Sequence, residues 1–420
     1  MKKLIFSLAL LGGILTGCSS DDDQPIVVTE VPGTGGGDDT DSVDTTLSGN
    51  ITEDMTLTND AIWQLDGRVI VTAGNTLTIE PGTIIKAFAG QEANASVLII
   101  ARDAKIEANG TATAPIIMTS SADGIQLGQT EGTLDENTRG LWGGLIVLGN
   151  APISEDGDVE ASQIEGIPAS DTNGLYGGTD AADDSGTITY VSIRHGGTLI
   201  GEGNEINGLT LGGVGTGTTI DHVEVVGNVD DGIEFFGGTV NASNLLVWAQ
   251  GDDGLDIDQA YAGTVTNAVV IAGDISDHAL EIDGPEGSLN GAFTLNNITL
   301  IGSATAPNGE YADYRDGAQG ATNNVFVTGF QDGKDVELDN NGVAQNYISG
   351  LISFTNWIVE GVTPANSIFV EKTGDGEETI ISPSFTDQAA DWTTAGTTGG
   401  ADLTVFAWTF AAATTSGVID

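Results

Sequence analysis

The chain has 420 residues, and its 61 Asp and Glu against 11 Lys and Arg give a formal net charge of −50. Nucleic acids and anionic lipid surfaces are bound by clustered Lys and Arg, so this balance excludes both as partners and favours the binding of cations. A single cysteine, Cys18, leaves no second thiol for a disulfide within the chain.

The first 17 residues have the features of a targeting segment. Lys2 and Lys3 precede an apolar run over residues 4–15, which is too short to span a bilayer stably. The run ends in the tetrapeptide Leu-Thr-Gly-Cys, which resembles a bacterial lipobox and implies cleavage before Cys18 and lipidation of that residue. The alternative is an ordinary secretory signal with a chance cysteine. We therefore expect a signal peptide over residues 1–17 and a protein anchored to a membrane rather than crossing it.

The segment after the cysteine is acidic and poor in apolar residues. Its Ser-Ser-Asp-Asp-Asp start resembles the export signal of surface lipoproteins in the Bacteroidetes, which implies the cell-surface side of the outer membrane. Residues 18–50 are rich in Gly, Asp and Thr and have no apolar periodicity, so we expect a flexible tether.

From residue 51 the sequence predicts short strands with alternating apolar and polar residues. The first are expected over residues 68–71, 76–80, 83–86, 97–101, 105–108 and 116–119. Later ones, over residues 223–225, 245–247, 269–271, 298–300, 325–327 and 351–353, recur at intervals of 22 to 29 residues. No window predicts an amphipathic helix of useful length, which excludes a doubly wound α/β fold.

Regular spacing of this size is typical of a solenoid in which each repeat forms one coil. We expect the solenoid over residues 51–384, an N-terminal cap at residues 51–65, and loops at residues 155–185 and 303–319. Residues 385–420 are expected to form a C-terminal cap because they concentrate Trp392, Phe406, Trp408 and Phe410, with a short helix at 386–392. A pair of antiparallel β-sandwiches is the alternative fold. Asn228, Asn244, Asn267 and Asn297 are expected at turns with left-handed backbone geometry.

Five long motifs carry a resemblance to a known family. They are TLTIEPGTIIKA, LIIARDAKIEANGTATAPIIMTSS, GLWGGLIVLGNAPI, EINGLTLGGVGTGTTIDHVEV and DDGIEFFGGTVNA. They resemble a family of right-handed parallel β-helix lipoproteins and secreted proteins common in Bacteroidetes. The resemblance covers residue 51 to the C-terminus and implies an all-β, single-stranded right-handed parallel β-helix with caps at both ends. It implies no settled biochemical role.

Four acidic motifs repeat along the solenoid. Ile233, Leu255, Leu280 and Val336 head them, and these apolar residues are expected to point inward. The next residues, Glu234, Asp256, Glu281 and Glu337, are then expected to form an outward column. Further columns are expected from Asp258, Asp283 and Asp339, and from Asp231, Asp253 and His278. Stacking places neighbouring carboxylates about 5 Å apart.

Such columns need relief from charge repulsion, and three forms of relief remain open. The acids extend into water as a solvated face, take up protons, or bind a hard divalent cation, for which calcium suits an all-oxygen donor set. The predicted cation ligands are Asp230, Asp231, Glu234, Asp252, Asp253, Asp256, Asp258, Glu281 and Asp283.

The few basic residues are the remaining candidates for function. We expect Arg194, His195 and His278 to contact a ligand, and we consider Lys334 and Arg315 as candidate catalytic bases. Parallel β-helices include lyases in which carboxylates hold calcium and a Lys or Arg abstracts a proton from a uronate. The resulting hypotheses are a cell-surface protein that binds calcium and a glycan or partner protein, a calcium-dependent polysaccharide lyase or hydrolase, and a structural adhesin. The family setting makes an outer-membrane transporter a further candidate partner.

Overall fold

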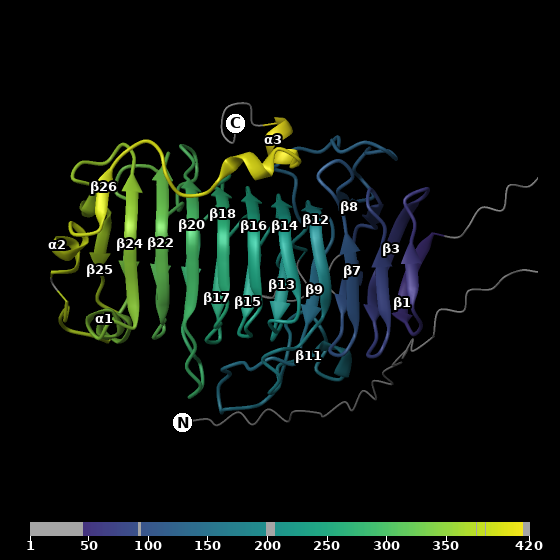
Figure 1. Ribbon diagram of the computed structural model, residues 1–420, viewed down its shortest axis with the longest axis horizontal. Coiled ribbons are helices and arrows are strands. Elements are labelled where there is room, and N and C mark those ends of the chain that lie inside the picture. The colour runs from purple at the N-terminus through teal and green to yellow at the C-terminus, as the bar shows by residue number, and fades with distance from the viewer. Residues whose placement is uncertain (1–44, 91–93, 199–205, 375, 383, 415–420) are drawn as a thin grey trace, which may run out of the picture.

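The structure is a computed structural model that describes residues 45–90, 94–198, 206–374, 376–382 and 384–414. The expected signal peptide, Cys18 and residues 18–44 of the tether lie outside the described residues. The described chain forms a right-handed parallel β-helix whose coils stack along the long axis of the molecule (Figure 1). Its long ladders are parallel, which confirms the predicted fold class and excludes the sandwich. No helix in these ranges has the length and apolar character needed to cross a bilayer.

One face of the solenoid is a ladder of short strands that we call the site sheet. Each strand pairs in register with the strand one coil away, because the alternating residues leave every second side chain in the core. Its strands are β6 (Val97–Ile100), β9 (Leu145–Leu148), β13 (Leu209–Gly212), β15 (Ile233–Phe236), β17 (Leu255–Asp258), β19 (Leu280–Ile282), β21 (Ala312–Tyr314), β23 (Val336–Leu338) and β25 (Phe369–Glu371).

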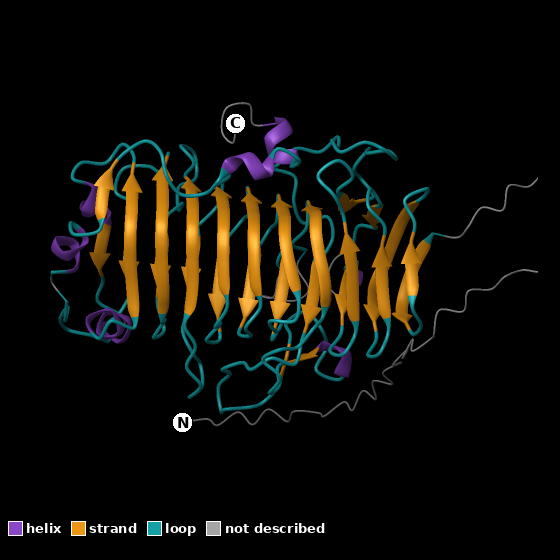
Figure 2. Ribbon diagram, viewed as in Figure 1, coloured by secondary structure: helices purple, strands orange, loops and turns teal. Residues whose placement is uncertain are grey.

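The other two faces are formed by longer strands that bend in the middle (Figure 2). These are β12 (Gly186–Arg194), β14 (Thr219–Val226), β16 (Asn241–Trp248), β18 (Thr264–Ile271), β20 (Phe293–Ile301), β22 (Gly320–Thr328) and β24 (Ile352–Val359). The first coils add β1 (Thr46–Ile51), β2 (Met55–Leu57), β3 (Ile62–Val71), β4 (Thr76–Ile79), β5 (Ile84–Ala87), β7 (Lys105–Asn109) and β8 (Ile116–Ser120). The last coil adds β26 (Thr393–Ala395), and a loop carries the antiparallel pair β10 (Ser162–Gln163) and β11 (Leu175–Tyr176).

The predicted strands overlap observed ones throughout. The one expected at 351–353 lies at the start of β24, where Trp357 and not Leu351 is the register partner of Val325. The bends occur at residues with positive φ, among them Asn244 (55°), Asn267 (65°) and Asn297 (59°), as predicted. Asn228 differs: it is fully buried, and its amide donates to the backbone of Ile206 and Asp231.

The interior is one continuous column of apolar side chains. Ile233, Leu255, Leu280 and Val336 are all fully buried in it, which confirms that the residues heading the acidic motifs point inward. Because the next residue along each strand points to the opposite side of the sheet, the acidic side chains of the site sheet leave the core.

The C-terminal end is closed by packed aromatics. Trp392 stacks on Phe354 with ring centroids 5.0 Å apart and meets Phe369 edge-on at 4.5 Å. The helices here are α1 (Asn341–Ile348), the 3-10 helix η3 (Ala365–Ile368) and α2 (Phe385–Ala389), and α2 overlaps the predicted helix. A further 3-10 helix, η2 (Thr172–Gly174), lies in the long loop before β12.

Residues 396–414, which we call the strap, do not cover the end of the solenoid. They run back over the bent strands from β26 toward β14 and contain η4 (Leu403–Phe406) and α3 (Phe410–Thr414) (Figure 1). Phe406 and Phe410 pack against Trp248 on this flank. The backbone N–H groups of Phe410 and Ala411 donate to the buried carboxylate of Glu224, at 3.1 and 2.8 Å. Residues 396–414 of the expected cap therefore pack on a side face of the solenoid and not on its end.

Candidate functional site

The site sheet carries an unbroken row of acids that we call the carboxylate ladder. Strand register aligns Glu234 with Asp256, Asp256 with Glu281, Glu281 with Asp313 and Asp313 with Glu337. The predicted column of Glu234, Asp256, Glu281 and Glu337 is thus present, and Asp313 is an additional member between Glu281 and Glu337. Asp313 belongs to a coil that the sequence analysis assigned to the loop at 303–319.

The ladder side chains are less accessible than expected. As whole residues, Glu234, Asp256 and Glu281 are 7, 6 and 9% exposed, so the interpretation of these acids as a solvated face is wrong. Because burial disfavours the charged form and neighbouring carboxylates repel it, the pKa of Glu234 and of Asp256 lies well above the usual range. The same causes raise the pKa of Glu281 to about 9 and that of Asp313 to about 7.

The second predicted column, two residues after the ladder on each strand, contains a basic side chain among its acids. Asp258 is followed one coil on by Asp283, then by Arg315 and Asp339, as the backbone hydrogen bonds between coils show. The guanidinium donates from Nη2 to Glu281 Oε1 at 2.6 Å and from Nε to Asp283 Oδ1 at 2.7 Å. Burial raises the pKa of Asp258 to about 8, and the nearby Asp283 adds to the shift.

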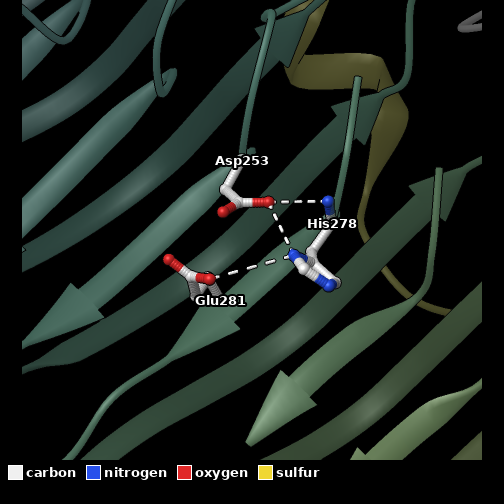
Figure 3. A group of neighbouring side chains, drawn as sticks. All are labelled: Asp253, His278 and Glu281. Atoms are coloured by element: carbon white, nitrogen blue, oxygen red, sulfur yellow. Dashed lines mark hydrogen bonds and ion pairs between the residues drawn. The ribbon is translucent and has the colours of Figure 1, made fainter. Parts of the chain in front are cut away.

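A second cationic group lies on the other side of the ladder. His278 Nδ1 is 3.0 Å from Asp253 Oδ1 and 3.9 Å from Glu281 Oε1, so the imidazole lies between two carboxylates (Figure 3). Burial alone would lower the pKa of His278, but the hydrogen bond to Asp253 and the surrounding acids raise it to about 10. Of the three residues expected to contact a ligand, His278 is the one that reaches this site.

The C-terminal coils carry two further counter-ions. Lys334 Nζ is 3.5 Å from Glu310 Oε1 and donates to the carbonyls of Pro307 and Asn308 at 2.8 Å. Lys372 Nζ is 2.5 Å from Glu337 Oε2 and 3.2 Å from Asp335. Lys334, which was considered as a catalytic base, is therefore a counter-ion of Glu310 in the preceding coil.

In the described chain, the N-terminal half of the ladder has no recorded ion pair with a basic side chain. None of the ion pairs recorded among the described residues involves Asp231, Glu234 or Asp256. Glu234 accepts from the buried amide of Asn207, and Asp231 accepts from the backbone of Asp253 at 2.9 Å. Asp256 Oδ1 is buried and has no hydrogen-bond partner in the described structure. An ionised carboxylate in this position is costly unless a cation reaches it.

The donor set fits a hard divalent cation. Asp231, Glu234 and Asp256 each offer a ligand oxygen within 4.8 Å of the others, and so do Asp256, Glu281 and Asp283. Asp230 and Asp252 form a comparable group with Asp231. All of these atoms are carboxylate oxygens, the ligands that calcium prefers. The predicted cation ligands thus occupy one continuous region, centred on Asp256.

An open cleft of about 540 Å³ adjoins this region at the carboxyl ends of β17, β19 and β21. It is lined by Asp258, Asp283, Gly284, Pro285, Glu286, Asp316, Gly317 and Asn340. One wall is fastened to the long loop after β9, because Glu286 N donates to the Ser154 carbonyl at 3.1 Å and Ser288 N donates to Asp158 at 2.6 Å. Four lining carboxylates make the cleft strongly acidic.

Arg194 and His195 lie elsewhere. Both are buried, at 1 and 0% exposure, at the end of β12 and outside the site sheet. Arg194 donates from Nε to Ser192 at 2.7 Å, lies 3.9 Å from Glu224 and covers the Phe410 ring at 4.6 Å. His195 Nδ1 is 2.8 Å from the Thr138 carbonyl, and burial lowers its pKa. These contacts hold the strap and the loop before β9, and neither residue reaches the ladder or the cleft.

Comparison with known proteins identifies the family. No curated protein and no solved structure matches the chain significantly. A family model described as a pectate-lyase-like beta helix domain matches residues 49–411, which includes the ladder, the cleft and most of the strap. The chain therefore belongs to the pectate-lyase-like β-helix domain family.

Proposed function

We propose that this protein binds divalent cations, calcium above all, on the carboxylate ladder and uses them to hold an acidic polysaccharide in the adjoining cleft. The observation that carries the proposal is Asp256. Its buried carboxylate lies between Glu234 and Glu281 in the ladder, and its Oδ1 has no hydrogen-bond partner among the residues that the structure describes. A divalent cation would supply the missing partner and cancel the repulsion at once.

The distribution of basic side chains along the ladder also supports a cation site at Asp256. Arg315, Lys334 and Lys372 form ion pairs with Glu281, Glu310 and Glu337 in the C-terminal coils. Among the described residues, Asp231, Glu234 and Asp256 have no ion pair, and in the C-terminal coils the same holds for Asp313. The charged residues that line the cleft are all acidic and repel a polyanion, so an acidic polysaccharide needs cations there to be retained. Membership of a pectate-lyase-like family supports a polysaccharide as the ligand class.

Calorimetric titration of calcium into chelator-treated protein tests the cation. We expect saturable binding of at least one calcium ion, with magnesium weaker because its small octahedral shell tolerates crowded carboxylates poorly. Binding of oligogalacturonate, measured with and without calcium, tests the ligand. Failure of calcium to bind at millimolar concentration would contradict the proposal.

The family match favours a second candidate function, a calcium-dependent polysaccharide lyase. A lyase needs a base, and Arg315 was considered for that role. Burial would lower the pKa of Arg315, but its hydrogen bond to Asp283 and the nearby acids raise that pKa above the usual range. The guanidinium therefore keeps its proton while its ion pairs with Glu281 and Asp283 persist. Lys334 likewise holds a counter-ion position beside Glu310. An ultraviolet assay for unsaturated uronates with polygalacturonate decides this candidate, since a lyase creates that chromophore and a binding protein does not.

The cellular location is a separate proposal. Lipidation of Cys18 would anchor the protein to the outer membrane with the solenoid facing the cell exterior. Labelling with a radioactive fatty acid should modify the wild-type protein and not a Cys18→Ser variant. External protease should then degrade the solenoid on intact cells.

A further inference from the structure

We propose that Arg315 is an exchangeable counter-ion: it releases Glu281 and Asp283 when a divalent cation takes these carboxylates, and its freed guanidinium then binds the carboxylate of a uronate in the cleft. This inference rests on the cation binding proposed above and adds the residue that would couple cation to ligand.

The first argument is that Arg315 and a cation compete for the same oxygens. Glu281 and Asp283 form a potential cation group with Asp256, with ligand atoms within 4.8 Å of one another. Arg315 already binds Glu281 Oε1 at 2.6 Å and Asp283 Oδ1 at 2.7 Å. The third member, Asp256, has a buried oxygen with no hydrogen-bond partner in the described part of the chain. The recorded ion pairs of Arg315 thus reach Glu281 and Asp283 but not Asp256, whereas a divalent cation would reach all three carboxylates.

The second argument is accessibility. The Arg315 side chain is 35% exposed, while those of Glu281 and Asp283 are 12 and 16% exposed. The guanidinium therefore covers the carboxylates from the solvent side and can leave without opening the core. Arg194, by contrast, is fully enclosed and cannot exchange.

The third argument concerns the destination. The 540 Å³ cleft is lined by Asp283, the partner of Arg315, and by the two residues that follow Arg315 in sequence, Asp316 and Gly317. No cationic side chain is among the residues that line it, so its acids offer nothing to a carboxylate ligand. A released Arg315 would enter this cleft from its edge, and its planar fork matches a carboxylate in two hydrogen bonds.

The release itself can be followed by phenylglyoxal modification of the whole protein, with each arginine quantified by peptide mass spectrometry. Losing two partly exposed ion pairs should raise the reactivity of Arg315 about two- to thirtyfold at saturating calcium. Arg194 should stay unreactive in both conditions. Unchanged or lower reactivity of Arg315, in protein that binds calcium, would overturn the exchange.

Arg315→Gln provides an independent measurement. Removing the competing charge should tighten calcium binding about tenfold, while oligogalacturonate binding in calcium should weaken about tenfold. Lys105→Gln is the matched control: it removes the same charge from an exposed pair with Asp184, on β7 and outside the site sheet, and should leave both affinities within about twofold.

The outcomes separate the two proposals. Absence of calcium binding in the wild type defeats the proposed function itself. Calcium binding that Arg315→Gln does not tighten defeats only the exchange. Release of Arg315 without binding of oligogalacturonate defeats the assignment of a uronate as the ligand.

Discussion

Replacing Asp256 by Asn is the most direct perturbation of the ladder. Stacking places its neighbours Glu234 and Glu281 about 5 Å away, and each ionised pair at that distance costs about 3 kcal/mol at an effective dielectric of about 20. Burial and these neighbours hold the pKa of Asp256 well above the usual range, which favours the protonated, uncharged carboxyl when calcium is absent. An amide has nearly the same shape, and the free energy of unfolding should change by less than about 1 kcal/mol.

With calcium the two proteins should differ. A ligand present at 100 times its dissociation constant stabilises the native state by about 2.7 kcal/mol. For about 370 folded residues, an unfolding entropy of about 2.1 cal/mol/K per residue converts this into a rise in Tm of about 3.5 °C. Losing the central carboxylate should weaken calcium binding at least about 100-fold, which reduces the rise to less than about 1 °C.

Differential scanning calorimetry in chelator and in calcium measures both effects. Asp184→Asn is the control, because this exposed acid pairs only with Lys105 in the recorded ion pairs and lies outside the site sheet. The reasoning is refuted if Asp256→Asn keeps the full calcium-induced rise in Tm, or if the variant is strongly destabilised in chelator.

Three further predictions concern pH and the core. In the presence of chelator, the protein should lose stability as the pH rises from about 5 to about 9. The native pKa is about 8 for Asp258 and about 9 for Glu281, above the unfolded value of about 4. A carboxyl with a raised native pKa contributes stability at low pH, and this contribution is lost as the pH rises through the native pKa. Calcium should flatten this decline in Tm. Glu224→Gln should cost about 3–5 kcal/mol in urea unfolding, since it leaves the buried charge of Arg194 unpaired and disturbs the docking of the strap; a loss below about 1 kcal/mol would refute that role. Trp357→Ala should cost about 3–5 kcal/mol by the same assay, because this side chain is fully buried in the core, and an unchanged midpoint would contradict its packing role.

Much of the site could be predicted because solenoid strands repeat. The spacing of Ile233, Leu255 and Leu280 gave the register of three coils, and the acids that follow them in sequence were correctly aligned. The next coil was missed because residues 303–309 extend the interval from Leu280 to Ala312 to 32 residues, which resembles a loop. Because that coil was not recognised, the sequence predicted neither the place of Asp313 in the ladder nor the position of Arg315 beside Glu281. The alternation in Tyr-Ala-Asp-Tyr was the available signal.

The amino-acid sequence by itself determined the all-β solenoid, the inward apolar residues and the acidic face, because all three follow from local alternation and from the interval between repeats. Only the tertiary structure decided which acids are buried, which have a cationic partner and which do not. Those properties depend on contacts between residues from different coils, such as Arg315 with Glu281 and Glu224 with the strap. Local pattern cannot encode such contacts, since each inserted loop shifts where distant side chains meet.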